Sequence, residues 1–310
     1  MKVIPLGADS LGVRSMATFV EVGRTGILLD PGATLAPARF GLPPTDEEWD
    51  ALRRVNDRIS AYATRAQLVF VSHYHEDHFR SDPASYRGRL VMAKDPRRLM
   101  QAQQARRGIE LWRALDGHAR VEAADAAVRR EADLTLEVSP PLAHGVEGTA
   151  LGYVVALTVV DHAERERFVF ASDVQGPLSP VAAAYLARQR PTLLYLSGPP
   201  SYLEHALGAA VIDRAVEHLL RIMEATGCRV ILDHHAVREA RWRQRLGRLL
   251  ETGRVTTAAG HVGVAETLLE AGRRERWSVL RRPPARVPGE RAMITRRGVN
   301  RRTAKGGRPE

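Results

Sequence analysis

The sequence predicts an α/β protein in which two β-sheets are covered by helices on their outer faces. Three observations carry this prediction. Short apolar runs typical of paired strands come early in the chain, and strands alternating with helices come later. The length of 310 residues allows a sizeable core.

The first half of the chain opens with strands and adds its helices later. A tight turn at Gly23 is expected to join two of the strands, and Thr45 with Glu48 forms a capping-box pattern at a helix start. The glutamines after Pro96 are expected to face solvent rather than substrate. The expected elements are strands at residues 1–6, 17–22, 26–30, 67–71 and 89–93 and helices from 45 to about 66 and from 96 to about 115.

The second half alternates strands with helices, as expected for helices packed on a sheet. Most of its strands end in a polar or charged residue followed by a loop. The expected elements are strands at residues 134–138, 151–160, 167–171, 192–196 and 230–235 and helices at 180–190, 204–226 and 238–251.

Composition favours a protein of the cytoplasm with no membrane partner. Cys228 is the one cysteine, which fits a reducing compartment and rules out an internal disulfide framework. The first residues contain no long apolar segment of the kind found in signal peptides. No apolar run reaches the roughly 20 residues that a transmembrane helix needs.

The positive charge is concentrated at the carboxyl end of the chain. Residues 281–310 contain ten Lys/Arg and two Glu, so they hold +8 of the net +10 and leave about +2 for residues 1–280. We therefore expect a domain at 1–280 and a basic, disordered tail at 281–310. That tail is a candidate contact for nucleic acid or an acidic surface, and a solvated tail is an equal alternative.

The stretch from Ser72 to Phe79 contains the strongest chemical signal. His73 and His75 are two positions apart, so on an extended backbone they point to the same side. Asp77 and His78 follow where a turn can bring them back toward that side. Three imidazoles and a carboxylate within six residues match the ligand chemistry of zinc or a similar transition metal. The alternative is a polar loop in which histidines happen to cluster.

Further polar residues fall at strand ends or in the loops that follow them, where rigid elements can bring side chains from distant positions together. Asp30 follows an early strand, with an Asx-turn role as the alternative reading. The others are His144, Asp173 and the pair His234 and His235.

At these positions the chain resembles the metallo-β-lactamase superfamily, whose signature is His-x-His-x-Asp-His followed by a later His, Asp and His. The series is complete and in order between residues 30 and 235, and it consists of Asp30, His73, His75, Asp77, His78, His144, Asp173 and His234. Five further segments look like a subfamily of predicted hydrolases known largely from archaeal genomes: residues 9–15, 30–32, 40–44, 198–200 and 233–235. The Arg-rich tail lies outside this resemblance.

The resemblance implies a four-layer αββα sandwich, with residues 1–280 as a metallo-β-lactamase-like hydrolase domain and a two-metal site at one edge. It assigns His73, His75 and His144 to the first metal. It assigns Asp77, His78 and His234 to the second, with Asp173 bridging the two. The expected ions are zinc, with manganese or iron as alternatives.

Catalytic roles are expected for Asp77 and His235. In the implied reaction a metal-activated hydroxide attacks the substrate, and Asp77 orients it. His235 would support a ligand or contact the substrate, although it also remains the alternative to His234 as the last ligand.

The favoured function is hydrolysis of an anionic ester, with a phosphodiester ranked above a lactone or a thioester. One alternative is a nuclease acting on RNA or DNA, with residues 281–310 as an electrostatic anchor. Another is a non-catalytic binding protein that retains the fold. The complete ligand series argues against this last reading.

Overall fold

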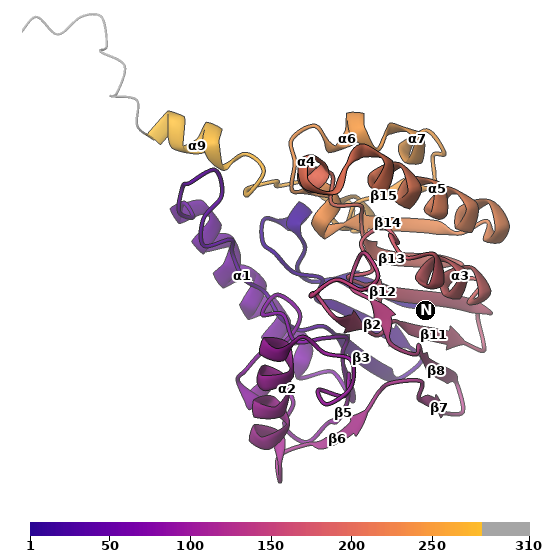
Figure 1. The fold of residues 1–310 in the computed structure, drawn as a ribbon. Coiled ribbons are helices and arrows are strands. Elements are labelled where there is room, and N and C mark those ends of the chain that lie inside the picture. Colours follow the sequence, from indigo (N-terminus) through magenta and orange to yellow (C-terminus); the bar gives the residue numbers. More distant parts are fainter. Residues whose placement is uncertain (281–310) are drawn as a thin grey trace, which may run out of the picture.

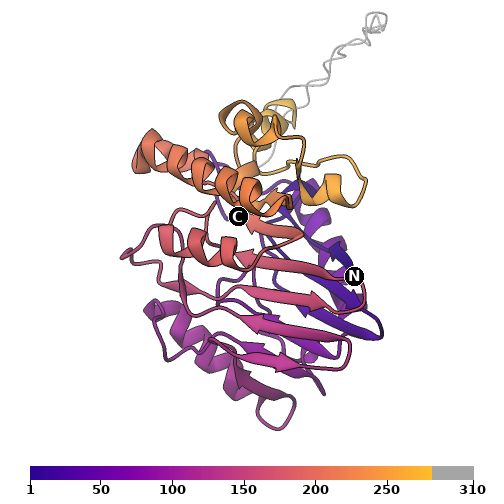
Figure 2. The same ribbon diagram turned by 90° about the vertical axis from the view of Figure 1, so that its right-hand side faces the viewer.

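The protein is described by a computed structural model of the 310-residue chain, in which residues 1–280 are placed (Figure 1). The predicted basic tail lies outside the described residues, so it and the boundary at residue 280 remain predictions. Two sheets lie face to face with helices on either side (Figures 1 and 2).

The first sheet comes from the amino-terminal half and has six strands in sequence order. The first three strands are antiparallel, and β3 to β6 run parallel. The strands are β1 (Lys2–Pro5), β2 (Thr18–Val22), β3 (Thr25–Leu29), β4 (Leu68–Val71), β5 (Leu90–Ala93) and β6 (Arg120–Ala123). Helices α1 (Asp46–Ala63) and α2 (Ala102–Leu115) pack on its outer face through Val55, Ile59 and Leu111.

The second sheet has seven strands in the order β15-β14-β13-β12-β11-β8-β7. Strands β12 to β15 are parallel, and the β7–β8–β11–β12 side is antiparallel. Its members are β7 (Val128–Arg130), β8 (Leu134–Val138), β11 (Leu157–Asp161), β12 (Glu166–Ser172), β13 (Leu193–Ser197), β14 (Arg229–Asp233) and β15 (Val255–Thr256). Helices α3 (Pro180–Arg188) and α5 (Ala209–Thr226) cover its outer face.

Each sheet has an apolar core beneath its covering helices, and a third apolar core fills the space between the two sheets. It joins Phe70 of the first sheet to Phe168 and Phe170 of the second, all essentially buried. Helix, sheet, sheet and helix therefore stack as four layers, which confirms the predicted αββα sandwich. Because β3, β4, β12 and β14 belong to parallel pairs, the residues at their carboxyl ends can meet at one edge of the sandwich.

The remaining described elements are short and connect the layers. They include the 3₁₀ turns η1 (Asp9–Leu11) and η4 (His234–Val237), which lie against each other at the edge of the sheets. The others are η2 (Pro83–Ser85), β9 (Leu142–Ala143), β10 (Tyr153–Val154), η3 (Ser201–Leu203), α4 (Glu204–Leu207), α6 (Trp242–Arg245), α7 (Gly247–Leu250), α8 (Ala258–His261) and α9 (Arg273–Leu280). None of the helices within residues 1–280 is long and apolar enough to cross a membrane.

Three helices and one strand differ from the sequence prediction. The helix expected at 238–251 is instead the two short helices α6 and α7, and the strand expected at 151–160 is divided into β10 and β11. The helix expected from Pro96 begins at Ala102, because Asp95 accepts from the Arg97 N–H in a local turn and Gln101 supplies the N-cap. The helix expected at 204–226 is divided at Gly208, whose φ of 87° is open to glycine but costly for other residues. Capping of α1 by Thr45 and Glu48 is confirmed.

Candidate metal centre

The candidate ligands gather at the edge where the strands end. The loop after β4 carries His73 to His78, β12 leads into Asp173, and β14 into His234. Three residues at these strand ends hold a left-handed backbone: Asp30 with φ 41°, Ser172 with φ 49° and His234 with φ 57°. Non-glycine residues adopt this conformation at an energetic cost, and such strain is concentrated at functional sites.

Asp30 fastens the loop that carries the histidine motif. Its carboxylate accepts the Ser72 N–H at 2.7 Å and the Ser72 hydroxyl at 2.5 Å, which is possible because β3 and β4 are parallel neighbours. The same carboxylate lies 2.8 Å from Nδ1 of His78. With the His78 proton held at Nδ1, its Nε2 is left to face the other candidate ligands. Asp30 therefore holds a neighbouring loop rather than a local turn.

The first group of candidate ligands consists of His73, His75, His144 and Asp173. One nitrogen or oxygen atom from each lies within 4.8 Å of the others. The His73 Nε2 atom is 3.1 Å from the His75 Nδ1 atom, and the His144 Nε2 atom is 3.3 Å from the Asp173 Oδ2 atom. All four predicted residues thus meet, although they come from three separate segments.

The second group of candidate ligands consists of Asp77, His78 and His234, again with one atom each within 4.8 Å. The Nε2 atom of His234 lies 3.5 Å from Asp77 Oδ2 and 3.7 Å from Asp173 Oδ1. The Asp173 Oδ2 atom lies 3.4 Å from Nε2 of His78. Asp173 therefore stands between the two groups, where the resemblance expects a bridging carboxylate.

Several nitrogen and oxygen atoms of these side chains are buried and lack a hydrogen-bond partner within residues 1–280. They are His78 Nε2, Asp173 Oδ1, His144 Nδ1 and His235 Nδ1. Leaving a buried polar atom unpaired is costly, so such atoms point to an ion or a ligand. Imidazole nitrogens and carboxylate oxygens in these numbers suit zinc and related divalent ions, so the residues present fit such a metal.

Asp9 and Arg238 contact the second group. Oδ2 of Asp9 lies 2.7 Å from Nδ1 of His234, and its Oδ1 accepts from Nε of Arg238 at 2.8 Å. Nη2 of Arg238 lies 3.1 Å and 3.0 Å from the two nitrogens of His234 and 3.5 Å from Oδ2 of Asp77. The near-equal distances place Nη2 over the imidazole face, which leaves the Nε2 lone pair in the ring plane open.

Sequence reasoning missed the roles of three residues at this centre. Asp9 and Arg238 lie far apart in the chain, and the only signal for Asp9 was its place in the segment 9–15. Gln104 was expected to face solvent, but it is 2% exposed and its Nε2 lies 3.2 Å from Nε2 of His75. The expectation was wrong because a polar residue on a helix looks the same in sequence whether it faces water or a buried imidazole.

The pKa values divide the histidines into two kinds. Burial, reinforced by neighbouring imidazoles, lowers the pKa of His73 and brings that of His75 to about 4. Burial also opposes the charged form of His78, but Asp173, Asp30 and Asp77 outweigh it and raise the His78 pKa well above its usual range. Despite burial, His78 and His234 together with Arg238 keep the pKa of Asp77 low, so this carboxylate stays ionised.

His235 sits beside the cluster rather than within the second group. Its ring stacks on His234 with centroids 4.6 Å apart, and its Nε2 is 3.8 Å from Oδ2 of Asp173. The centroid of the Tyr202 ring lies 6.3 Å from that of the His235 ring. His234 groups with Asp77 and His78, and His234 and His235 both group with Asp173, so His234 as the last ligand remains a prediction with His235 as its alternative.

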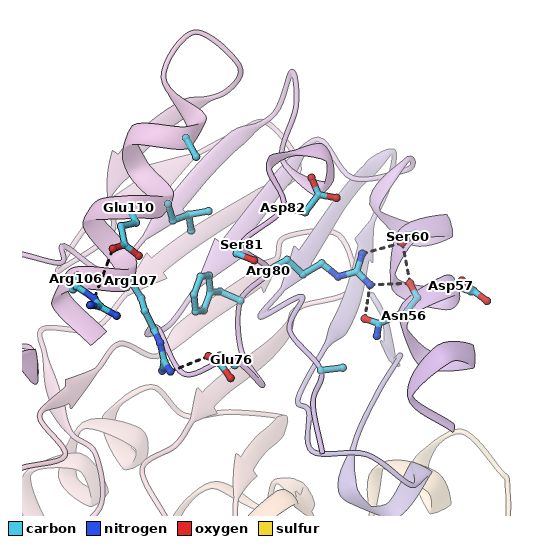
Figure 3. Close-up of a pocket in the computed structure, with 14 residues that line it drawn as sticks. Asn56, Asp57, Ser60, Glu76, Arg80, Ser81, Asp82, Arg106, Arg107 and Glu110 are labelled. Carbon is cyan, nitrogen blue, oxygen red and sulfur yellow. Dashed lines mark hydrogen bonds and ion pairs between the residues drawn. The ribbon is translucent and has the colours of Figure 1, made fainter. Parts of the chain in front are cut away.

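A polar cavity of about 810 Å³ lies behind the motif loop, between α1 and α2 (Figure 3). Arg80 reaches across to Asn56 and Ser60 of α1, and Arg107 of α2 donates to Glu76 at 2.8 Å. None of the candidate ligands lines this cavity. Arg80 and Arg107 therefore hold the motif loop against α1 and α2.

Two sheets stacked between helix layers, with a His-x-His-x-Asp-His loop at the edge where the strands end, define a metallo-β-lactamase fold. More particularly, the chain belongs to the UPF0282 family. It is 39% identical over 293 residues to the UPF0282 protein of Methanopyrus kandleri, covering 89% of this chain and 98% of that protein. It is 36% identical over 312 residues to the UPF0282 protein of Pyrobaculum arsenaticum, covering 94% and 99%. The predicted resemblance to an archaeal subfamily is confirmed.

No protein-family model matches the chain. Among solved structures it is similar to unliganded yeast PDE1, with 12% identity, a TM-score of 0.48, and 82% of this chain and 96% of that chain covered. It is also similar to the short form of human tRNase Z, with 14% identity, a TM-score of 0.46, and coverage of 76% and 92%. At this distance the likeness says nothing about what this chain acts on.

Proposed function

We propose that this protein is a metal-dependent hydrolase that cleaves phosphodiesters at a dinuclear site. The first group, His73, His75, His144 and Asp173, would hold one ion. The second group, Asp77, His78 and His234, would hold the other, and Asp173 would bridge them. Zinc is the favoured ion, with manganese and iron as alternatives that the same nitrogen and oxygen donors accept.

The observation that carries the proposal is the set of buried, unpaired donor atoms at the centre of the cluster. Nε2 of His78 and Oδ1 of Asp173 have no hydrogen-bond partner in the described chain, yet they lie where both groups meet. The other atoms of these side chains have neighbours, since His78 Nδ1 contacts Asp30 and Asp173 Oδ2 lies near His78 and His144. Leaving the two remaining buried atoms unpaired is costly in a folded protein, whereas two divalent ions would satisfy both.

When bound, the ions would supply Lewis acidity at the phosphoryl oxygens and an activated water. The chain's own residues then have separate tasks. Asp77 stays ionised, so its carboxylate can accept a hydrogen bond from the nucleophile and orient it. His235 is neutral because burial lowers its pKa, and its unpaired Nδ1 is available to a substrate oxygen or the leaving group.

A phosphodiester is preferred over a lactone or thioester because the surroundings suit an anion. Buried Arg238 keeps its charge beside the second group, since Asp9 outweighs the effect of burial on its pKa. Arg39 adds positive charge on the Tyr202 side of the centre, where its guanidinium lies 5.0 Å from the centre of the Tyr202 ring and that ring lies 6.3 Å from the ring of His235. Positive groups of this kind stabilise the charge that grows on phosphoryl oxygens.

The test is to replace one ligand of the first group and the bridging ligand. His75→Ala and Asp173→Ala should both lose bound metal, measured by elemental analysis of the dialysed protein. Both should also lose phosphodiesterase turnover. His118→Ala is the matched control, because His118 is exposed and its side chain makes no hydrogen bond or ion pair within residues 1–280. Metal content and turnover that survive both changes would reject the site.

The substrate class is decided by assaying the same metal-loaded protein on a phosphodiester, a lactone and a thioester. A faster reaction with the lactone or thioester would keep the hydrolase and replace its substrate. Bound metal without turnover on any of the three would favour the non-catalytic binding protein.

A nuclease is the second candidate. Helix α9 ends the described chain on the side of the molecule that carries Arg39 and Tyr202, and residues 281–310 with their ten Lys/Arg follow directly. A basic segment starting there could hold a polynucleotide near the centre through its phosphates. Deleting 281–310 should then raise KM for polynucleotide in a salt-dependent way, and an unchanged KM would exclude this role.

A further inference from the structure

A hollow distinct from the cavity between α1 and α2 lies on the Tyr202 side of the candidate metal centre. It has a volume of about 370 Å³, and basic side chains outnumber acidic ones in its lining, which includes Arg39, Arg241, Arg274, Phe40, Tyr202, Glu239 and Glu275. Tyr202 connects the hollow to the centre, because its ring lies 5.0 Å from the guanidinium carbon of Arg39 and 6.3 Å from the ring of His235.

Phe40 is held in a conformation that its side chain disfavours. It has φ 56° and is followed by Gly41 with φ 71°, in a two-residue turn closed by hydrogen bonds between Arg39 and Leu42. Turns with positive φ at both central residues normally carry Asn, Asp or Gly. A bulky residue there is an outlier, and it leaves the Phe40 ring 43% exposed.

Two guanidinium groups share this exposed ring. The guanidinium carbon of Arg39 lies 4.8 Å from the ring centre of Phe40, and that of Arg274 lies 4.6 Å from it. The two carbons are therefore less than about 10 Å apart, close to one screening length at physiological salt. Like charges this close repel each other unless an anion lies between them.

Neither arginine has a hydrogen-bonded carboxylate within residues 1–280. Arg14 takes both oxygens of Glu270 at 2.6 Å, so Arg39 shares that carboxylate only through a longer ion pair, with its Nε 3.8 Å away and without a hydrogen bond at that atom. The hydrogen bond that Arg39 does make is from Nη2 to the carbonyl of Arg238. Arg274 makes no ion pair within residues 1–280, where its partner is the Phe40 ring.

The cavity between α1 and α2 provides the contrast. There Arg107 pairs with Glu76, Arg106 with Glu110, and Arg80 with Asn56 and Ser60 (Figure 3). Those arginines are satisfied within the protein. Arg39 and Arg274 instead line the hollow without a hydrogen-bonded carboxylate in the described chain, so an anionic ligand could supply one.

We propose that Arg39 and Arg274 form a subsite for a second anionic group of the substrate, such as a phosphate one linkage away from the scissile phosphodiester. The proposal rests on the phosphodiesterase function above and adds a preference to it. Guanidinium groups bind phosphate through paired N–H donors, and the rings of Phe40 and Tyr202 keep both groups in place. The preferred substrate is therefore a phosphodiester with a neighbouring phosphate.

The test compares two dinucleoside phosphates that differ only in a terminal phosphate, using the full-length, metal-loaded protein. The native enzyme should favour the phosphate-bearing substrate at least about tenfold in kcat/KM, the size of one well-placed charged hydrogen-bond pair. Arg274→Gln should reduce this ratio to near one. Arg276→Gln is the matched control: it lies two residues further along α9, pairs with Glu47 and should keep the ratio. A ratio that is near one in the native enzyme or unchanged in Arg274→Gln overturns the subsite.

A binding measurement separates the subsite from the proposed function. Sulfate pairs with guanidinium groups, so it should raise Tm more in the native protein than in Arg274→Gln, with Arg276→Gln like the native protein. The general stabilising effect of sulfate is common to all three and cancels in the comparison. If no phosphodiester is cleaved but this difference persists, the proposed function fails and the anion subsite stands. Equal shifts in all three proteins reject an anion site at Arg274.

Discussion

The two groups of candidate ligands are neighbours, yet their surroundings differ in charge. The first group places three imidazoles around Asp173, and none of its side chains pairs with a lysine or arginine in the described chain. The second group adds Asp77 and has Arg238 in contact with two of its members. The first group is therefore a nitrogen-rich site with one carboxylate, Asp173, whereas the second depends on a balance of several fixed charges.

This difference has a thermodynamic consequence. A divalent ion at the first group needs neutral imidazoles and the Asp173 carboxylate, and burial already keeps His73 and His75 neutral by lowering their pKa values. An ion at the second group must displace a proton from His78, whose pKa is raised, and must tolerate a nearby guanidinium. We expect the first ion to bind more tightly than the second.

Removing one ligand from each group gives the largest expected effect. His144→Ala should lose the first ion and retain the second, whereas His234→Ala should do the opposite, so each variant keeps about one ion per chain. Each should also lose turnover by more than about 100-fold, the upper range for residues that merely orient a ligand. Elemental analysis and steady-state kinetics provide the measurements. Loss of both ions in either variant would show that the groups do not act separately.

Acid should then separate the two ions in the native protein. Because the His78 pKa is raised, its proton competes with the second ion, and apparent affinity should fall about tenfold for each pH unit below that pKa. His75 takes up a proton only near its pKa of about 4, so His75 does not oppose the first ion at mild acidity.

The check is metal retention after dialysis at a series of pH values between neutrality and pH 5. One ion should be lost early and the other kept, and His78→Ala should have no early phase because its second ion is already weak. Two ions that leave together would contradict the charge difference between the groups.

Much of this arrangement could be predicted from the sequence. The strand-end positions of Asp30, Asp173 and His234 predicted that the site lies at one edge of the sandwich, and the motif after β4 predicted most of the candidate ligands. Residues that act through a ligand were harder to find. Arg238 and Asp9 are 229 positions apart and belong to common residue types, so only the packing of η4 against η1 brings them together.

A variant of Asp9 tests the difference between the two groups of ligands, because within the described chain Asp9 contacts a ligand of the second group, His234, and none of the first. In Asp9→Asn the side chain can still accept from Nδ1 of His234, but it loses the charge that makes the imidazole a stronger donor and that balances Arg238. Second-ion affinity should fall about 10- to 100-fold, and first-ion affinity should not change. Titration of the metal-free protein with zinc measures both. An equal loss at both groups would indicate general unfolding, which the Tm of the same samples would reveal.

Arg238 should produce the smallest effect, and in the opposite direction. Its charge lies 3.5 Å from Oδ2 of Asp77, where it competes with a divalent ion for the same carboxylate. Replacing it in Arg238→Met should therefore raise second-ion affinity by roughly tenfold, the size of a unit charge acting on a divalent ion at about 5 Å under water-like screening. Arg241→Met is the control, because Arg241 is exposed and makes no ion pair within residues 1–280.

The two substitutions in one ion pair are thus expected to change second-ion affinity in opposite directions. A purely structural role for the pair does not predict this difference. If Asp9 and Arg238 served only to hold η1 against η4, then Asp9→Asn and Arg238→Met would both weaken the second ion. Arg238→Met leaves the buried Asp9 carboxylate without its arginine and with only His234 beside it, so the double variant Asp9→Asn with Arg238→Met shows whether any loss comes from that uncompensated carboxylate. Weaker second-ion binding in Arg238→Met that the double variant does not correct would mean that Arg238 orients His234 and does not compete with the metal.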